Sequence, residues 1–448
     1  MDEASVRIDG LDEDGRGVGA AAGVEVHVVD ALPGETVIAR IDHTSPHAAR
    51  AWGVRVRLAS PPSTERVPPA CPAFGRCGGC TLQHLCYPGQ LTEKRRRVER
   101  ALAAHPALAH VAVDDVVASP HELHYRNKAK YVVGPGGVLG SYAPATHDIV
   151  DMAGCRVPEE PIDAVAGTVR RELARAGVPA YDERARRGEL RHVVVRANHE
   201  GRVLVVLVVA APPREALRRA AQAIRRAAPA VAGVVGNVNA TTGGAIFGPT
   251  DVPLAGAAAL ADEIGGVRLE LSARSFFQVN RAAAARLYDE VVRVVAPARG
   301  VRVVDLYTGV GGIALTLAAR GADVLGVEAN ADAVADARRS AHALGLRARF
   351  AAGDAAAGLR EHADVVVVNP PRKGLSEDAR AAILAARPPR LVYVSCGPRS
   401  LGTDLAALAG AYDVAGVRPF DLMPGTPQVE TVVSLTSRGS ARPGRGGR

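Results

Sequence analysis

Short apolar segments alternate with turn residues over the first 60 residues of the chain. The segments 24–29, 36–41 and 54–58 predict strands, and a Pro-Gly turn at 33–34 separates the first two. Short strands at this spacing are typical of a small β-barrel. A proline-rich linker at 60–69 follows. We therefore expect residues 1–60 to form an OB-like β-barrel domain.

The hydrophobic pattern changes twice after the linker. Residues 190–196 and 203–209 predict strands, and the Ala- and Arg-rich segment 214–227 predicts an amphipathic helix. From about residue 266 the order is strand, Gly-rich turn, helix, repeated, with strands at 301–306, 322–328, 363–368 and 391–394. Such alternation implies a parallel, doubly wound sheet. The chain is therefore predicted to be an α/β protein, with a mixed α+β central domain at 61–265 and a Rossmann-like domain at 266–436.

Composition adds two expectations. The chain has no apolar run of membrane-spanning length and begins on acidic residues, which predicts a soluble cytoplasmic protein without a membrane partner. The net charge of +8 fits a polyanionic partner such as nucleic acid. The basic run 94–97 is either a phosphate-contacting helix face or an ordinary solvated surface. The Gly- and Arg-rich tail at 437–448 is expected to be disordered and at most an auxiliary RNA contact.

The cysteines divide into two kinds. In a long chain without a signal peptide, six cysteines favour metal binding or catalysis over a disulfide framework. Cys71, Cys77, Cys80 and the distant Cys155 supply four thiolates, enough for a [4Fe-4S] cluster or tetrahedral zinc. The spacing does not separate these two. Cys396 stands apart, because it follows the strand 391–394 and would place a thiol at a strand end, either as a nucleophile or as a buried inert side chain.

Two further strand ends carry candidate chemistry. The glycine-rich turn 307–312 allows a ligand to approach the backbone closely, and Glu328 ends the next strand, where a carboxylate accepts hydrogen bonds from a ribose. An ordinary tight turn is the alternative. The spacing from Asp305 to Gly309 and Gly311 resembles that of S-adenosylmethionine (SAM) methyltransferases. Asn369-Pro370-Pro371 follows the 363–368 strand, and Arg372 replaces the base-stacking aromatic of amino-methylating DNA enzymes, which favours carbon methylation.

Five motifs in the same order make the resemblance specific. They are Phe276-Phe277-Gln278-Val279-Asn280, Asp305-Leu306-Tyr307-Thr308-Gly309, Asn369-Pro370-Pro371-Arg372, Ser395-Cys396-Gly397-Pro398 and Val429-Glu430-Thr431-Val432. Over nearly its whole length the chain resembles the RNA 5-methyluridine methyltransferases. The branch it resembles has an N-terminal TRAM barrel and a [4Fe-4S] cluster and acts on 23S ribosomal RNA. The resemblance implies a class I SAM-dependent catalytic domain, RNA as the partner, and no obligate protein partner.

The same resemblance assigns the site residues. It implies SAM contacts at Gln278, Tyr307, Glu328 and Asn369, with Gly312 and Asp354 also near SAM. It makes Cys396 the nucleophile, Glu430 the base, and Cys71, Cys77, Cys80 and Cys155 the cluster ligands, leaving Cys86 as a spare thiol. Three residues depart from the family pattern: Asn369 stands where Asp is usual, Gly397 where Asn is usual, and Thr308 where Cys is usual.

Residue chemistry leads to the same assignment. C5 of uracil is a poor nucleophile until a thiolate adds at C6, and a base must then remove the C5 proton. The target base must be single-stranded or flipped out of a helix, and the segment 124–131 mixes aromatic and basic residues that would line an RNA path, unless it is simply a half-exposed edge strand. The alternatives are methylation of cytosine C5 or of another substrate, and a noncatalytic RNA-binding or ribosome assembly factor.

Overall fold

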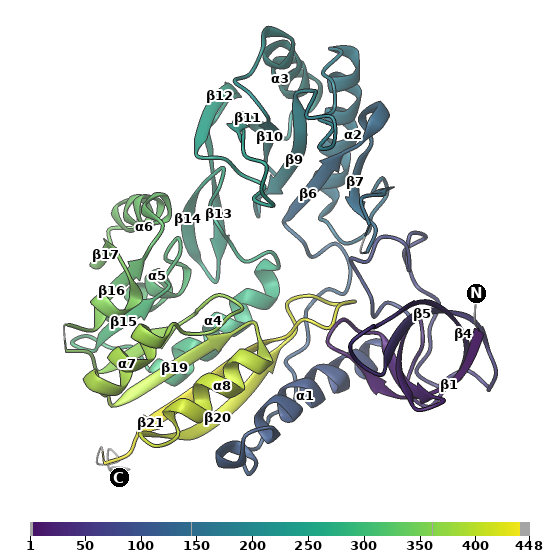
Figure 1. Ribbon diagram of the computed structural model, residues 1–448. Coiled ribbons are helices and arrows are strands. Elements are labelled where there is room, and N and C mark those ends of the chain that lie inside the picture. The colour runs from purple at the N-terminus through teal and green to yellow at the C-terminus, as the bar shows by residue number, and fades with distance from the viewer. Residues whose placement is uncertain (1–2, 145, 361, 440–448) are drawn as a thin grey trace.

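A computed structural model describes residues 3–144, 146–360 and 362–439 of the chain. Its first part is a closed five-stranded barrel in the order β1-β2-β3-β5-β4, drawn in purple in Figure 1. The strands are β1 (Glu3–Leu11), β2 (Gly17–Ala21), β3 (Val24–Val29), β4 (Thr36–Thr44) and β5 (Arg50–Leu58). Alternate apolar residues such as Val6, Ile8, Val26 and Val28 fill its interior.

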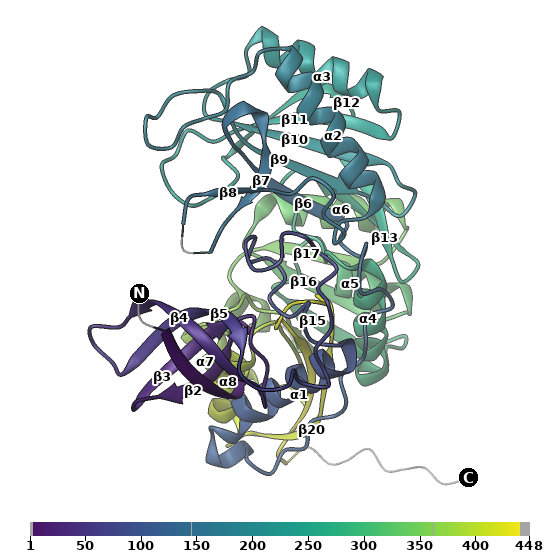
Figure 2. The same cartoon turned by 90° about the vertical axis from the view of Figure 1, so that its right-hand side faces the viewer.

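The helix α1 (Tyr87–Ala103) follows the barrel and a long loop. Its apolar side, with Val98 and Leu102, belongs to the same hydrophobic core as helix α8 (Pro398–Leu408) near the end of the chain. Figures 1 and 2 both show α1 beside the C-terminal domain. By packing, this helix therefore belongs with the C-terminal domain, although it precedes the central sheet in sequence.

The central domain is a seven-stranded sheet in the order β12-β11-β10-β9-β6-β7-β8. Its strands are β6 (Lys128–Val133), β7 (Leu139–Tyr142), β8 (Ile149–Asp151), β9 (Leu190–Ala197), β10 (Val203–Val209), β11 (Val231–Val238) and β12 (Thr250–Gly256). Helices α2 (Glu160–Arg175) and α3 (Glu215–Ala227) share one hydrophobic core with one face of this sheet. The other face forms a smaller core that includes Leu260 of the hairpin β13 (Ala259–Ile264) and β14 (Val267–Ser272).

The C-terminal domain holds a second seven-stranded sheet, in the order β17-β16-β15-β18-β19-β21-β20. Five of its strands are parallel: β15 (Arg302–Leu306), β16 (Asp323–Glu328), β17 (Ala348–Ala352), β18 (Val365–Val368) and β19 (Arg390–Ser395). Next to them lie β21 (Glu430–Ser437), antiparallel to β19, and β20 (Tyr412–Phe420), antiparallel to β21. Helices α4 (Arg281–Val295), α5 (Gly312–Ala319) and α6 (Ala331–Ala343) cover one face, and α1, α7 (Glu377–Ala386) and α8 cover the other.

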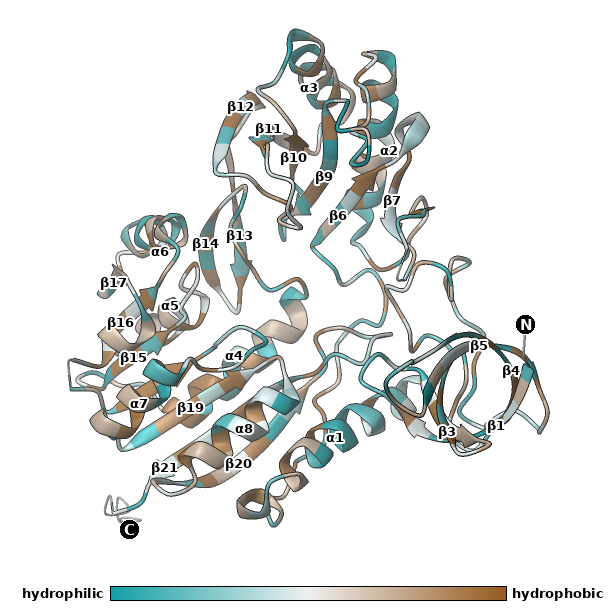
Figure 3. Cartoon of the chain, viewed as in Figure 1, coloured by the Kyte–Doolittle hydropathy of each residue, from teal (hydrophilic) through white to brown (hydrophobic). Residues whose placement is uncertain are grey.

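Alternation along the parallel strands explains this double covering. In β18, Val365 and Val367 point into one core, whereas Val366 and Val368 point into the other. A strand buried on both faces must be apolar at every position, and Figure 3 shows hydrophobic residues concentrated along the strands. The predicted N-terminal barrel and doubly wound α/β sheet are confirmed. Among the described residues no helix is long and apolar enough to cross a membrane. Of the predicted tail, Ser437 ends β21 and residues 440–448 lie outside the described residues.

Candidate active site

The carboxyl ends of the five parallel strands form one edge of the C-terminal sheet, and most predicted site residues lie there. Tyr307 follows β15, Glu328 ends β16, Asp354 follows β17, Asn369 follows β18 and Cys396 follows β19. The strand order reverses between β15 and β18. Ligands of open α/β sheets bind at such a reversal. The sheet thus brings together residues that are far apart in sequence.

The glycine-rich turn after β15 has the geometry that its sequence predicts. Gly309 and Gly311 have φ of 57° and 84°, in the left-handed region that favours glycine. The Gly309 amide donates a hydrogen bond of 3.0 Å to Glu328 Oε2, which joins the turn to the end of β16. A Cβ at Gly309 would meet nothing within 4 Å, so the turn is open to a ligand. Gly312 begins α5, and a Cβ there would lie 2.5 Å from the Tyr288 hydroxyl.

Tyr307 is strained, because its φ of 61° lies in the left-handed region that non-glycine residues avoid. Such strain is concentrated at functional sites. Burial raises the pKa of its phenol, while hydrogen bonding with Ser376 opposes that shift. The charge of Asp354 also raises this pKa. A strained tyrosine thus lies at the edge where the strand order reverses.

Cys396 and Glu430 meet across two neighbouring strands. In the antiparallel pair β19–β21, Ser395 is the partner of Thr431. Cys396, the residue after Ser395, therefore lies beside Glu430, the residue before Thr431. Burial first, and then the negative charge of Glu430, raise the pKa of the Cys396 thiol to about 11. Burial raises the pKa of Glu430 to about 7. A thiol and a carboxyl that exchanges protons near neutral pH are thus placed together.

Arg372 contributes a positive charge to this pair, a role that the sequence did not indicate. Its guanidinium lowers the pKa of both Cys396 and Glu430 against the effect of burial. The Ser400 hydroxyl donates to the Arg372 carbonyl over 2.9 Å and so holds the loop that carries Arg372. A Cβ at Gly397 would lie 2.8 Å from the Ser400 Oγ and 2.9 Å from the Arg372 carbonyl oxygen. Glycine therefore suits position 397 because Ser400 fills the space.

The loop 421–429, which leads into Glu430, is held by elements distant in sequence. Asp421 and Lys94 of α1 form a fully buried ion pair, and Lys94 Nζ also donates to the Met423 carbonyl over 3.0 Å. The Gly425 amide donates to Gln90 of α1 over 2.7 Å, and its carbonyl accepts from the Leu82 amide over 2.9 Å. The position of Glu430 thus depends on α1 and on the cysteine-containing segment.

Gln278 lies outside the strand edge, on the segment before α4. Its carbonyl accepts a hydrogen bond of 2.8 Å from the Asn127 side chain of the central domain. The Asn127 amide also donates to the Val279 carbonyl over 2.8 Å. Asn280 caps α4 through the Ala283 amide and donates to the Leu422 carbonyl over 3.2 Å. This segment therefore connects the central domain to the loop before Glu430.

The four predicted metal-ligating cysteines lie near one another. Burial first, and then the charges of Cys155, Cys77 and Cys71, raise the pKa of Cys80 to about 12. All four are half-buried and unoxidised. Cys86, the residue before α1, is not among the cysteines whose charges shift the pKa of Cys80. Within the ranges that the structure describes, no group of three or more His, Cys, Asp or Glu side chains is arranged to hold a metal ion.

The basic run on α1 is not a free cationic face. Lys94 is buried in its ion pair, Arg95 pairs with Asp115 and Glu99, and Arg96 pairs with Glu93. Arg97 donates to the Glu13 carbonyl over 2.6 Å. Lys94 is thereby removed from the predicted phosphate-contacting face, whereas Arg95 and Arg96 remain 41% and 59% exposed within their ion pairs.

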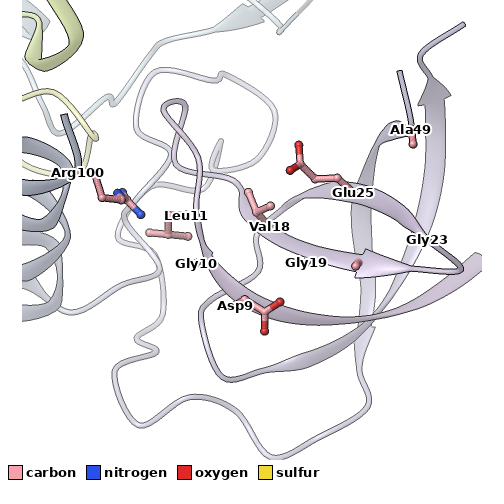
Figure 4. Close-up of a pocket in the computed structure, with 10 residues that line it drawn as sticks. Asp9, Gly10, Leu11, Val18, Gly19, Gly23, Glu25, Ala49 and Arg100 are labelled. Atoms are coloured by element: carbon pink, nitrogen blue, oxygen red, sulfur yellow. The ribbon is translucent and has the colours of Figure 1, made fainter. Parts of the chain in front are cut away.

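A hollow on the barrel also lies away from the strand edge. Figure 4 shows it beside β1, β2 and β3, lined by residues that include Asp9, Glu25 and Arg100 of α1. Two carboxylates among its lining residues make it a poor site for a phosphate or another anion.

Comparisons with known proteins agree with this geometry. Residues 286–388 match a profile described as methyltransferase small domain, and residues 358–438 match one described as tRNA (uracil-5-)-methyltransferase. An uncharacterized RNA methyltransferase of Geobacter sulfurreducens is 37% identical over 98% of this chain and 90% of its own length. One from Halalkalibacterium halodurans is 37% identical over 97% of each chain. The crystal structure of Pyrococcus abyssi tRNA (uracil-54, C5)-methyltransferase with S-adenosyl-L-homocysteine matches with a TM-score of 0.80 and 25% identity, covering 96% of this chain and 100% of that one.

Proposed function

The chain belongs to the RNA 5-methyluridine methyltransferase family, and on that premise we propose that it methylates C5 of a uracil in 23S ribosomal RNA through Cys396 and Glu430. It is a SAM-dependent RNA methyltransferase. The observation that carries the proposal is the pairing of Ser395 with Thr431, which puts the thiol and the carboxyl together at the sheet edge. The TRAM-like barrel and the central domain would bind the RNA.

The residues at the edge fit SAM. The open glycine turn leaves room for a ligand, Tyr307 is its first residue, Glu328 ends the neighbouring strand β16, and Asn369 follows the neighbouring strand β18. SAM supplies an electrophilic methyl group on a positively charged sulfur. Carboxylate and amide oxygens accept hydrogen bonds from the hydroxyl and amino groups of such a ligand. Asn369, where Asp is usual, retains that accepting capacity without the charge.

The protein residues then act in sequence on the uracil. The Cys396 thiolate forms a bond to C6, and the electron pair displaced from the C5–C6 double bond makes C5 nucleophilic. C5 takes the methyl group, whose bonding electrons stay with the donor sulfur. Glu430 removes the proton from C5, the double bond re-forms, and the C6–sulfur bond breaks to release Cys396. Arg372 favours the thiolate, because its charge lowers the pKa of Cys396.

Methyl transfer to defined RNAs tests this proposal. Purified protein is expected to transfer labelled methyl groups from SAM to 23S rRNA fragments, and nuclease digestion followed by mass spectrometry should find 5-methyluridine. Transfer RNA is the second candidate, because the matched Pyrococcus abyssi structure is a tRNA enzyme by its title. Label in tRNA alone would mean that the substrate is tRNA and not 23S rRNA. Label on cytidine would mean that the methylated base is cytosine and not uracil. No transfer to any RNA would refute the methyltransferase activity and favour a noncatalytic RNA-binding factor.

We also propose that Cys71, Cys77, Cys80 and Cys155 hold a [4Fe-4S] cluster with a structural role. The charges of Cys155, Cys77 and Cys71 all act on the Cys80 thiol, which supports a shared ligand. A single zinc ion needs its thiolates to converge at about 2.3 Å from one point. A [4Fe-4S] cluster is held by four cysteine thiolates, and Cys71, Cys77, Cys80 and Cys155 supply that number of free thiols. Methyl transfer requires no electron, so the group would organise the segment that contacts the loop 421–429.

Metal analysis of anaerobically purified protein tests the cluster. About four irons and four acid-labile sulfides per chain are expected, with a broad visible absorption band. Cys155→Ser should lose the band and most of the iron, whereas the matched variant Cys86→Ser should keep both. One zinc per chain without iron would refute the proposal.

A further inference from the structure

The strand β6 carries two lysines on a face of the central sheet that has few charge partners. It lies inside the sheet, between β9 and β7, so the segment 124–131 is not the half-exposed edge strand that the sequence allowed. Ala129 and Tyr131 point into the core with the helices. By alternation, Lys128 and Lys130 point to the opposite face.

Lys128 is buried on that face without an anion. It is 8% exposed, and its direct cross-strand partner in β9, Arg196, is 3% exposed. Every charged group that shifts the pKa of Lys128 is positive: Arg196, Lys130 and Arg126. Burial and these cations together lower that pKa to about 6. The Lys128 ammonium lies 5.6 Å from the centre of the Phe247 ring, its one aromatic contact among the described residues.

Arg196 is also incompletely paired. Its Nη2 donates to the Ser275 carbonyl, but its Nη1 is buried without a hydrogen-bond partner among the described residues. Asp262 and Asp336 act on it electrostatically, but each forms an ion pair with another arginine, Arg281 and Arg339 respectively. The cations near Lys128 therefore create a positive potential that no carboxylate of the described chain neutralises at close range.

Such an arrangement costs folding free energy, because a buried charge is stable only when it is paired. Lys94 illustrates the usual solution, since this equally buried lysine pairs with Asp421. A group that destabilises the folded chain is a candidate for function, because the same unpaired group can bind a ligand of opposite charge. The missing partner should be an anion that arrives from outside.

We propose that Lys128, with Lys130 and Arg126, forms a binding site for a backbone phosphate of the substrate RNA. This inference rests on the proposed function and adds where the protein binds the backbone of the substrate RNA. Asn127, the neighbour of Lys128, bonds the Gln278 carbonyl, and Arg196 bonds the Ser275 carbonyl. The phosphate site is thus tied to the segment 275–278 that leads to the catalytic edge. Lysine binds phosphate as a point charge and tolerates different sequences, which suits a contact that positions the backbone.

A Lys128→Met variant tests the site through binding rather than catalysis. Affinity for a fluorescent single-stranded oligouridylate, measured by anisotropy with S-adenosylhomocysteine present, should fall by about tenfold near 100 mM salt. The slope of log affinity against log salt should become shallower by about 0.7, as expected for one lost phosphate contact on a single strand. The thermal midpoint should rise, because folding no longer has to remove the proton from Lys128 or bury its charge. Lys128→Arg should keep the salt slope.

Two controls separate this site from general charge effects. Arg226→Met removes one exposed positive charge from α3, on the other side of the sheet, and should leave affinity and slope unchanged. Wild-type protein should also take up close to one proton on binding RNA at pH 8, measured calorimetrically in buffers of different ionisation enthalpy, because phosphate raises the low pKa of Lys128. Lys128→Met should not.

The outcomes are distinguishable from those of the methylation assay. Unchanged affinity and slope in Lys128→Met would overturn the phosphate site while leaving methyl transfer intact. A lower thermal midpoint together with weaker binding would also overturn it, because Lys128 would then be structural. Wild-type protein that binds RNA in a Lys128-dependent way but transfers no methyl group would keep the site and refute the proposed reaction.

Discussion

Glu430→Gln is expected to lower the turnover of RNA methylation by about 10²- to 10⁴-fold and to trap the RNA on Cys396 as a covalent adduct. The amide cannot take the C5 proton, so the step that precedes release of the thiol stops. The partner position supports this, because Glu430 begins β21 beside the end of β19, where Cys396 lies. The adduct should be visible as a slower band on a denaturing gel, and its mass should equal protein plus methylated RNA.

Three companion variants make this test specific. Cys396→Ala should abolish both turnover and adduct, and Glu430→Gln combined with Cys396→Ala should form no adduct at all. Cys86→Ala, which changes a thiol outside both the catalytic pair and the four clustered cysteines, should behave like wild type. An adduct that persists in the double variant would move the nucleophile to another residue, and full activity in Glu430→Gln would exclude Glu430 as the base.

Lys94→Met is expected to destabilise the protein by about 3–5 kcal/mol, because it leaves Asp421 buried without its charge partner. Both side chains are fully buried, so water cannot replace the lost lysine. The loss should appear as a lower midpoint in urea unfolding of the transition that includes the C-terminal domain. If Lys94→Met proves as stable as wild type, the ion pair does not support the fold.

The double variant Lys94→Met with Asp421→Leu removes both charges and should recover much of the lost stability. The matched control Arg96→Met removes an exposed ion pair on the same helix and should cost less than about 1 kcal/mol. Activity of the double variant then reports on position. Because the loop 421–429 leads into Glu430, a recovered fold with a lowered kcat and an unchanged Kd for RNA would identify the ion pair as a positioning contact.

Local sequence patterns were sufficient for the elements and for much of the site. The apolar strands with their glycine-rich turns predicted β15, β16, β18 and β19 to within two residues at each end. In a parallel sheet the carboxyl ends of strands meet at one edge, so the strand pattern alone was enough to group residues that follow strands, such as Tyr307, Glu328 and Cys396. The family resemblance, rather than spacing alone, set Cys155 beside Cys71, Cys77 and Cys80, and in the fold the charges of those three act on the Cys80 thiol.

Tertiary structure alone decided which charges are paired and which are not. Lys94 and Lys128 are both lysines beside other basic residues in the sequence, yet one is neutralised by Asp421, more than 300 positions away, and the other faces three cations. The proximity of Arg372 to Cys396 and the packing of α1 on the C-terminal domain are equally long-range. Periodicity and turn chemistry act between neighbouring residues and therefore leave a trace in the sequence. The burial and partners of a charge depend on strand register and packing between distant segments, and only the folded chain specifies those.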